Sequence, residues 1–340
     1  VGRRLLWALM TGYFDDFQFH GRPRDCESQQ ACVGRVLDLL IGFDAAKHLL
    51  PDQVRVVLGV QSDFSRVPLD GHIQLCVTDE RREKLVALIE SFVSKGRITH
   101  AEAGRLYGKA RWVLCPIFGK VFLAALQPLH DVAFSATVVA GTAMHACLVY
   151  LARVCRALRP VRIPLRPVRC DPPMLVFTDA SYQMRASRGE LGVFVACPVS
   201  GRSWFASALL PGWVIALFRS LEAKVTYICQ AEELAALCAL CTFPDLLRGR
   251  LIHHFVDNDA AKSALVKGAS SRPDSALVLL DYHIWVLELQ CYPWIGFVYS
   301  EDNVSDPPSR GDFDLMLRLG ARQRDMVFPA LLGFQTEVAS

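Results

Sequence analysis

The stretch PMLVFTDAS (Pro173–Ser181) decides how the second half of the chain is interpreted. Its apolar run LVF is typical of a buried strand, and Asp179 stands where that run ends. A second stretch, LIHHFVD (Leu251–Asp257), has the same form and ends at Asp257. Two apolar strands that each end in an aspartate predict that both carboxylates lie at one edge of a sheet.

The segments around these two strands predict the rest of that sheet. GELGVFVACP and RSWFASALL alternate like an antiparallel hairpin, with VSG between them. AEELAALCALCTF and DAAKSALVKG favour helices, and CYPWIGFVYS favours a last strand. We therefore predict an α/β fold, a mixed five-stranded sheet with flanking helices.

More acidic residues accompany the predicted sheet. Glu232 and Glu233 lie in the predicted first turn of the AEELAALCAL helix, and Asp306 follows the last strand in SEDNVSDPPSR. Each acid alone is ordinary, because aspartates often form turns and glutamates often begin helices. Four carboxylates from four elements, however, can hold two divalent ions about 4 Å apart, an arrangement that cleaves phosphodiesters.

Four segments, VFTDAS, QAEELAALCAL, FVDNDAAKSAL and NVSDPPSR, together resemble the ribonuclease H domain of retroelement polyproteins. The last has the form seen in DIRS-like and related retroelements. The resemblance implies a ribonuclease H-like fold, Mg²⁺ or Mn²⁺ as cofactor, and four catalytic, metal-binding acids: Asp179, Glu233, Asp257 and Asp306. Glu233 is preferred because Leu234 and Ala236 fit the family's frame, and Glu232 stays the alternative. The flexible-loop histidine of some members has no counterpart.

The first half of the chain carries a second pair of acids. LMTGYFDDFQFHG (Leu9–Gly21) places Asp15 and Asp16 between two predicted strands, either as a solvated hairpin tip or as metal ligands. GYFDDF resembles the Tyr-x-Asp-Asp hairpin of reverse transcriptases, which implies that both aspartates are catalytic metal ligands of a polymerase palm. GFDAAKHLLP resembles the next palm motif, with Lys47 assisting pyrophosphate departure and contacting nucleic acid.

The palm resemblance is incomplete. The third palm aspartate of the family, which lies on a strand far upstream, has no counterpart here, and the chain opens VGRRLLWALM without an initiator methionine. We therefore expect a fragment of a longer retroelement polyprotein, without nucleotidyl transfer of its own.

Helices are predicted after the palm-like segment. TDERREKLVALIESFVSKG has amphipathic spacing, and Thr99 and Glu102 have the spacing of a capping box. The resemblance implies a thumb here, whose Lys109 and Arg111 would contact the phosphate backbone of nucleic acid. The predicted organisation is a partial palm (1–75), a helical thumb or connection (76–155), a Pro/Arg-rich linker (156–173), a ribonuclease H-like domain (174–312) and a tail (313–340).

Composition limits the class of protein. The 340 residues are 52% hydrophobic and 21% charged with a net charge of +3, which indicates a globular chain that is only mildly basic. The 12 scattered cysteines favour reduced thiols in an intracellular protein, cytoplasmic or nuclear. The nearly charge-free stretch Val132–Ala152 is about long enough to span a bilayer, but its polar residues favour a buried helix and no membrane partner.

These observations predict Mg²⁺-dependent hydrolysis of the RNA strand of an RNA–DNA hybrid, in a chain whose partners are the hybrid and the rest of the polyprotein. Two alternatives remain open from the sequence. The first is a decayed or co-opted element copy that binds nucleic acid without catalysis. The second is a membrane-associated protein anchored by Val132–Ala152.

Overall fold

The computed structural model describes residues 9–13, 16–20, 31–32, 53–57, 59–118, 123–134, 141–157, 160–164, 172–183 and 188–331. The chain divides into two compact units, residues 1–55 with 63–65, and residues 56–62 with 66–340. The site lies in the second unit, which is described in more detail.

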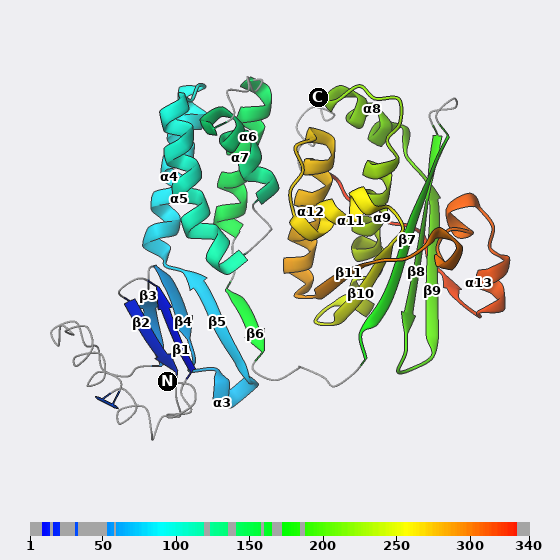
Figure 1. Cartoon of the computed structure of the whole chain (residues 1–340), viewed down its shortest axis with the longest axis horizontal. Helices are drawn as coiled ribbons and strands as arrows, with labels where there is room; N and C mark the ends of the chain where they lie inside the picture. Colours follow the sequence, from blue (N-terminus) through cyan, green and yellow to red (C-terminus); the bar gives the residue numbers. More distant parts are fainter. Residues whose placement is uncertain are drawn as a thin grey trace. The chain divides into compact units, whose positions relative to one another are not determined.

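The first unit contains a short hairpin. Strands β1 (Leu9–Tyr13) and β2 (Asp16–His20) pair antiparallel, with Tyr13 opposite Asp16 (Figure 1). Asp16 is thus the first residue of a strand, whereas Asp15 and Lys47 lie outside the described residues. A two-stranded hairpin occurs in many folds and does not by itself identify a polymerase palm.

A four-stranded sheet and a group of helices follow. The sheet has the order β3-β4-β5-β6, with these bounds: β3 (Val54–Val57), β4 (Val60–Asp63), β5 (His72–Val77) and β6 (Val161–Pro164). Strand β6 lies inside the range 156–173 that was expected to be a linker. The helices are α3 (Val67–Asp70), α4 (Asp79–Lys95), α5 (His100–Phe118), α6 (Leu123–Phe134) and α7 (Gly141–Ala157).

Local contacts confirm the predicted capping box. Glu102 accepts a hydrogen bond from the backbone N–H of Thr99 at 2.9 Å, and its own N–H donates to the Thr99 hydroxyl at 3.3 Å. The stretch Val132–Ala152, expected as one buried helix, is divided between the end of α6 and most of α7, and residues 135–140 lie outside the described residues. In α7, Leu148 and Leu151 are buried. Among the described helices, none combines the length and apolar character that a membrane span requires.

The second half of the chain forms the predicted mixed α/β sheet. Its order is β11-β10-β7-β8-β9-β12, with these bounds: β7 (Met174–Gln183), β8 (Arg188–Cys197), β9 (Arg202–Leu209), β10 (Leu251–Val256), β11 (Tyr292–Phe297) and β12 (Arg322–Gln323). Strands β7, β8 and β9 are antiparallel, whereas β10 is parallel to both β7 and β11. The two-residue strand β12, which lies in the expected tail, was not predicted.

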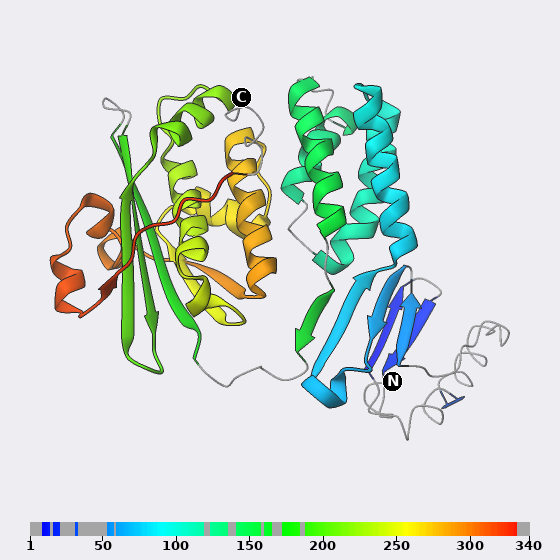
Figure 2. The same cartoon turned by 180° about the vertical axis from the view of Figure 1, so that it is seen from behind.

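Helices cover both faces of this sheet. They are α8 (Gly212–Leu221), α9 (Ile228–Thr242), α10 (Pro244–Leu247), α11 (Asp259–Lys267), α12 (Pro273–Leu289) and α13 (Asp314–Arg318). Helices α9 and α12 lie on one side of the sheet and α13 on the other (Figures 1 and 2). On the α13 side, Met316 packs with Phe194 and Phe205 in a small core of its own. Residues 313–331 therefore belong to the packing of this sheet.

The loop after β11 is fastened to the middle of the sheet. It contains the short turns η3 (Ser300–Asp302) and η4 (Pro308–Arg310). Ser181 of β7 donates to the carbonyl of Ser309 at 2.8 Å, and Ser207 of β9 donates to the carbonyl of Pro308 at 2.7 Å. Between these strands, Gly192 of β8 leaves the space that the loop backbone occupies. A Cβ at Gly192 would lie 2.4 Å from the Ser305 carbonyl oxygen and 2.6 Å from the Ser309 nitrogen.

Gly192→Ala should therefore displace the loop. We expect the free energy of unfolding in urea to fall by about 1–3 kcal/mol, as for other overpacked sites. Gly212→Ala is the matched control, because a Cβ at that position meets nothing within 4 Å, and it should not lower stability. Equal unfolding midpoints for the Gly192→Ala variant and the unmodified chain would contradict the close approach.

Candidate active site

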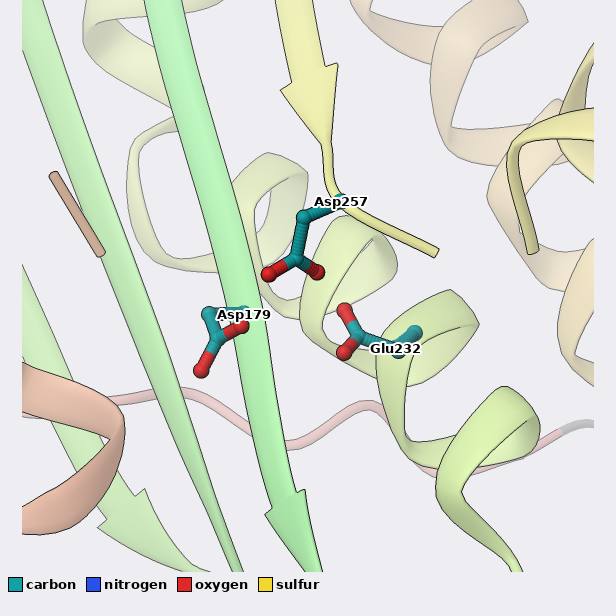
Figure 3. Close-up of side chains that lie close together, drawn as sticks. All are labelled: Asp179, Glu232 and Asp257. Atoms are coloured by element: carbon teal, nitrogen blue, oxygen red, sulfur yellow. The ribbon is translucent and has the colours of Figure 1, made fainter. Parts of the chain in front are cut away.

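Three acidic side chains meet beside the end of β10. Asp179, Glu232 and Asp257 each place one carboxylate oxygen within 4.8 Å of the others, and their side chains point toward one another (Figure 3). Asp257 directly follows β10, as predicted. Asp179 lies within β7 rather than at its end, because pairing with β8 continues to Gln183. Glu232 comes from α9, which begins at Ile228, so Glu232 lies beyond the first turn.

Asp179 is enclosed by the fold. Only 3% of the surface of Asp179 is exposed to solvent. The Ser309 hydroxyl is hydrogen-bonded to its Oδ2, and the Asn303 amide lies 3.5 Å from its Oδ1. The pKa of Asp179 is raised to about 7, chiefly by burial; the Ser309 hydrogen bond opposes the rise, and the charges of Asp257 and Asp306 add to it. Without a cation, this carboxyl therefore carries a proton through the mildly acidic range.

Glu232 is equally buried and lacks a full set of partners. Its Oε2 is buried and has no hydrogen-bond partner among the described residues. Burial raises the pKa of Glu232 well above its usual value, and the charges of Asp179 and Asp257 act in the same direction. Leaving a buried polar oxygen unpaired is costly, and a cation at this position would supply the missing partner. An all-oxygen donor set of this kind fits a hard divalent ion such as Mg²⁺ or Mn²⁺.

Asp306, the fourth predicted ligand, lies near the cluster but outside it. Its charge contributes to the raised pKa of both Asp179 and Glu232. Its Oδ1 accepts hydrogen bonds from Arg310, at 2.7 Å from Nη2 and 3.1 Å from Nε. The structure therefore brings three acids together and leaves Asp306 paired with a guanidinium at the rim.

Glu233, the preferred glutamate of the sequence analysis, does not lie in the cluster. Its Oε1 accepts a hydrogen bond from Ser275 at 2.8 Å and one from the Cys229 thiol at 3.6 Å. Burial raises the pKa of Glu233 to about 8, against the effect of these two hydrogen bonds. Neighbouring residues on a helix point about 100° apart, so only one of the two glutamates faces the aspartates. That residue is Glu232, and the preference for Glu233 is corrected accordingly.

The remaining predicted residues are not members of this cluster. Lys109 and Arg111 are exposed on α5, where Arg111 donates to the Tyr107 hydroxyl at 3.1 Å. Asp16 is described through its backbone alone, and Asp15 and Lys47 lie outside the described residues.

Sequence reasoning missed two residues that shape the site. Asn303 donates to the backbone carbonyl of Thr178 at 3.2 Å, and its own side-chain oxygen accepts from Ser305. The Ser309 hydroxyl is within hydrogen-bond reach of both Asp179 and the backbone carbonyl of Asp306, which lies 2.8 Å away, and its single proton is shared between these two acceptors. The signal was the polar run NVSDPPSR, of which only Asp306 had been given a role.

The chain matches no protein-family model, and no curated protein matches it in sequence. Among solved structures, it is similar to the RNase H1 of the halophilic archaeon Halobacterium salinarum NRC-1. The two are 14% identical, the match covers 42% of this chain and 97% of that chain, and the TM-score is 0.32. A score of this size does not establish a shared function, so the class of site follows from the carboxylates themselves.

The raised pKa of Asp179 predicts a pH-dependent cost of folding in the absence of metal. The unfolded residue loses its proton near 3.8 and the folded one near 7, so the folded state binds more protons between these values and stability falls as the pH rises. The full shift corresponds to roughly 4 kcal/mol. In EDTA, Asp179→Asn should thus stabilise the chain in urea, and by more at pH 8 than at pH 5.

Asp245→Asn is the matched control for this measurement. Arg324 holds the pKa of Asp245 below its usual value through hydrogen bonds at 2.6 and 2.9 Å, so this carboxylate is ionised at both pH 5 and pH 8. Its replacement should change stability by the same amount at the two pH values. A constant effect of Asp179→Asn would show that Asp179 does not titrate in this range.

Proposed function

We propose that this chain contains a ribonuclease H-like nuclease, which hydrolyses the RNA strand of an RNA–DNA hybrid with the help of Mg²⁺ or Mn²⁺. The observation that carries the proposal is the cluster of Asp179, Glu232 and Asp257, with one oxygen of each within 4.8 Å of the others. Its donors are all oxygens, and one of them, Oε2 of Glu232, is buried without a hydrogen-bond partner among the described residues. This combination suits a cation site far better than a structural hydrogen-bond network.

Each acid has a defined task in such a site. Asp179 and Glu232 must lose the protons that burial favours, so that both carboxylates face the cation as ionised ligands. Asp257, at the end of β10, supplies the third carboxylate, and Asp306 is available at the rim as a fourth. A bound pair of such ions supplies an activated water and stabilises the leaving oxygen. Ser309 and the buried walls around Asp179 orient its carboxylate and exclude bulk water.

The hybrid is proposed as substrate because the segments that bear these acids resemble retroelement ribonuclease H motifs. The order of the motifs supports the same origin, since GYFDDF precedes VFTDAS, as a palm precedes a ribonuclease H domain in reverse transcriptases. Recognition would then depend on duplex shape and 2′-hydroxyl groups rather than on base sequence. We extend the proposal to the whole chain: it derives from a retroelement reverse transcriptase polyprotein and acts in the cytoplasm or nucleus.

Incubation of the full chain with an end-labelled RNA–DNA hybrid tests the reaction. With Mg²⁺ we expect cleavage of the RNA strand, no cleavage of double-stranded DNA, and no activity in EDTA. Asp257→Asn should reduce cleavage at least about 100-fold, because the amide loses the charge a dication needs. It should leave hybrid binding within about twofold, because affinity comes mainly from backbone phosphates. Equal cleavage by this variant would refute the mechanism, and binding without any cleavage would favour a non-catalytic element copy.

The two adjacent glutamates provide a matched pair of variants. Glu232→Gln should abolish cleavage, because it removes a ligand charge from the cluster. Glu233→Gln should retain most activity, since its pKa of about 8 keeps the native residue largely neutral at pH 7 and glutamine can still accept from Ser275. Initial cleavage rates at pH 7 distinguish the two. A greater loss in Glu233→Gln would reverse the assignment.

A further inference from the structure

Arg310 is the cation that the metal-free site already contains. Its guanidinium directs both Nη2 and Nε to the same oxygen of Asp306, at 2.7 and 3.1 Å. The pKa of Arg310 is raised mainly by its hydrogen bonds to Asp306 and by the charge of that residue. The charges of Asp179 and Asp257 raise it as well. Within the part of the chain that the structure describes, this is the one ion pair between a basic side chain and the four acids. Arg310 thus lies in the combined field of the site.

The backbone of Arg310 is held within the loop by hydrogen bonds, whereas its side chain is largely exposed. The backbone N–H of Arg310 donates a hydrogen bond to the Pro307 carbonyl at 3.0 Å. The hydroxyl of the adjacent Ser309 is within hydrogen-bond reach of Asp179 and of the Asp306 carbonyl. The side chain of Arg310, in contrast, is 66% exposed, whereas that of Asp306 is 25% exposed. The guanidinium can therefore leave Asp306 by rotation of its own side chain, without a change in the loop.

A dication on Asp306 would compete with this pair. The guanidinium and the ion would share one carboxylate at a separation of a few ångströms, where two positive charges repel strongly. Once released, a planar guanidinium at the rim has the geometry that suits a phosphate group, with two parallel N–H donors. The polymer that would approach this rim carries one phosphate per nucleotide.

We propose that Arg310 exchanges partners when the site is filled: it neutralises Asp306 in the metal-free chain and binds a backbone phosphate of the nucleic acid when metal occupies the acids. The inference rests on the proposed function for its phosphate, but not for its first half, which concerns the metal alone. Arg310 is on this account a positioning residue toward Asp306 and a substrate-binding residue toward the hybrid.

Calorimetric titration of the full chain with Mn²⁺, without nucleic acid, tests the first half. Arg310→Gln removes the competing cation, so the apparent affinity for the metal should rise about 3- to 10-fold. In the Asp306→Asn background the same substitution should have no effect, because the shared carboxylate is gone. Arg318→Gln on α13, an exposed arginine of the same region, should leave metal affinity unchanged. Unchanged or weaker metal binding in Arg310→Gln would overturn the exchange.

Fluorescence anisotropy with a labelled hybrid tests the second half. The measurement uses Ca²⁺ so that a cation is bound while the RNA strand stays uncut, because the longer and more flexible coordination of Ca²⁺ differs from the octahedral geometry of Mg²⁺. A gel confirms that the strand is intact. Arg310→Gln should weaken binding about 10-fold in Ca²⁺ but less than about twofold in EDTA. Arg310→Lys should restore the metal affinity of the unmodified chain yet still bind the hybrid weakly, since it keeps the charge and loses the paired donors.

The outcomes separate this inference from the proposed function. A chain that cleaves the hybrid while both Arg310 variants bind metal and hybrid normally would refute the inference alone. A chain that never cleaves, but whose Arg310→Gln variant binds metal more tightly, would refute the nuclease and support the competition for Asp306. Thermal unfolding of each variant confirms that the fold is intact before the affinities are compared.

Discussion

Asp179, Glu232 and Asp257 repel one another whenever they are ionised, yet folding gathers one oxygen of each within 4.8 Å. Burial makes the repulsion worse, because the low dielectric of the interior strengthens the interaction between like charges. The sheet and its helices must therefore hold the acids against a force that would separate them. Burial is the largest cause of the raised pKa of Asp179 and of Glu232, and the charges of the neighbouring acids raise both in the same direction. Geometry that costs free energy in this state becomes favourable only when a cation is present.

The packing of helix α9 keeps Glu232 close to the two aspartates. All residues from 230 to 242 are buried, so the helix cannot rotate without exposing apolar surface. Polar contacts also join the start of α9, and the segment just before it, to α12, on the side away from Asp179 and Asp257. Ser275 donates to Glu233, while Lys224 and Gln230 both donate to the buried Asp274. These contacts fix the start of α9, and with it the direction in which Glu232 points. The two adjacent glutamates thus have different environments.

The sequence predicted the mixed sheet and the meeting of Asp179 with Asp257, because apolar strands that end near an acid have a clear pattern. It preferred Glu233 on the family's frame, because α9 is buried on every side from residue 230 onward and has no solvent-facing polar side that would distinguish the two glutamates. It did not find Ser309 or Asn303, whose roles depend on contacts between residues more than 100 positions apart. Strand β12 was missed because two residues carry no periodicity. For Asp15 and Lys47 the hypothesis stands as the sequence made it, since both lie outside the described residues.

The site also depends on a residue that has no functional group. Gly192 makes room for the backbone of the loop that bears Asp306, Ser309 and Arg310, and any side chain there would meet that backbone. A copy of the gene that acquired a larger residue at this position would still encode every acid, every strand and the complete NVSDPPSR motif. Its acidic residues would look unchanged, although its loop could no longer lie on the sheet as it does here. Replacing one hydrogen atom by a methyl group is therefore enough to separate a complete motif from a correctly placed one, and a comparison of the acidic residues alone would not show the difference.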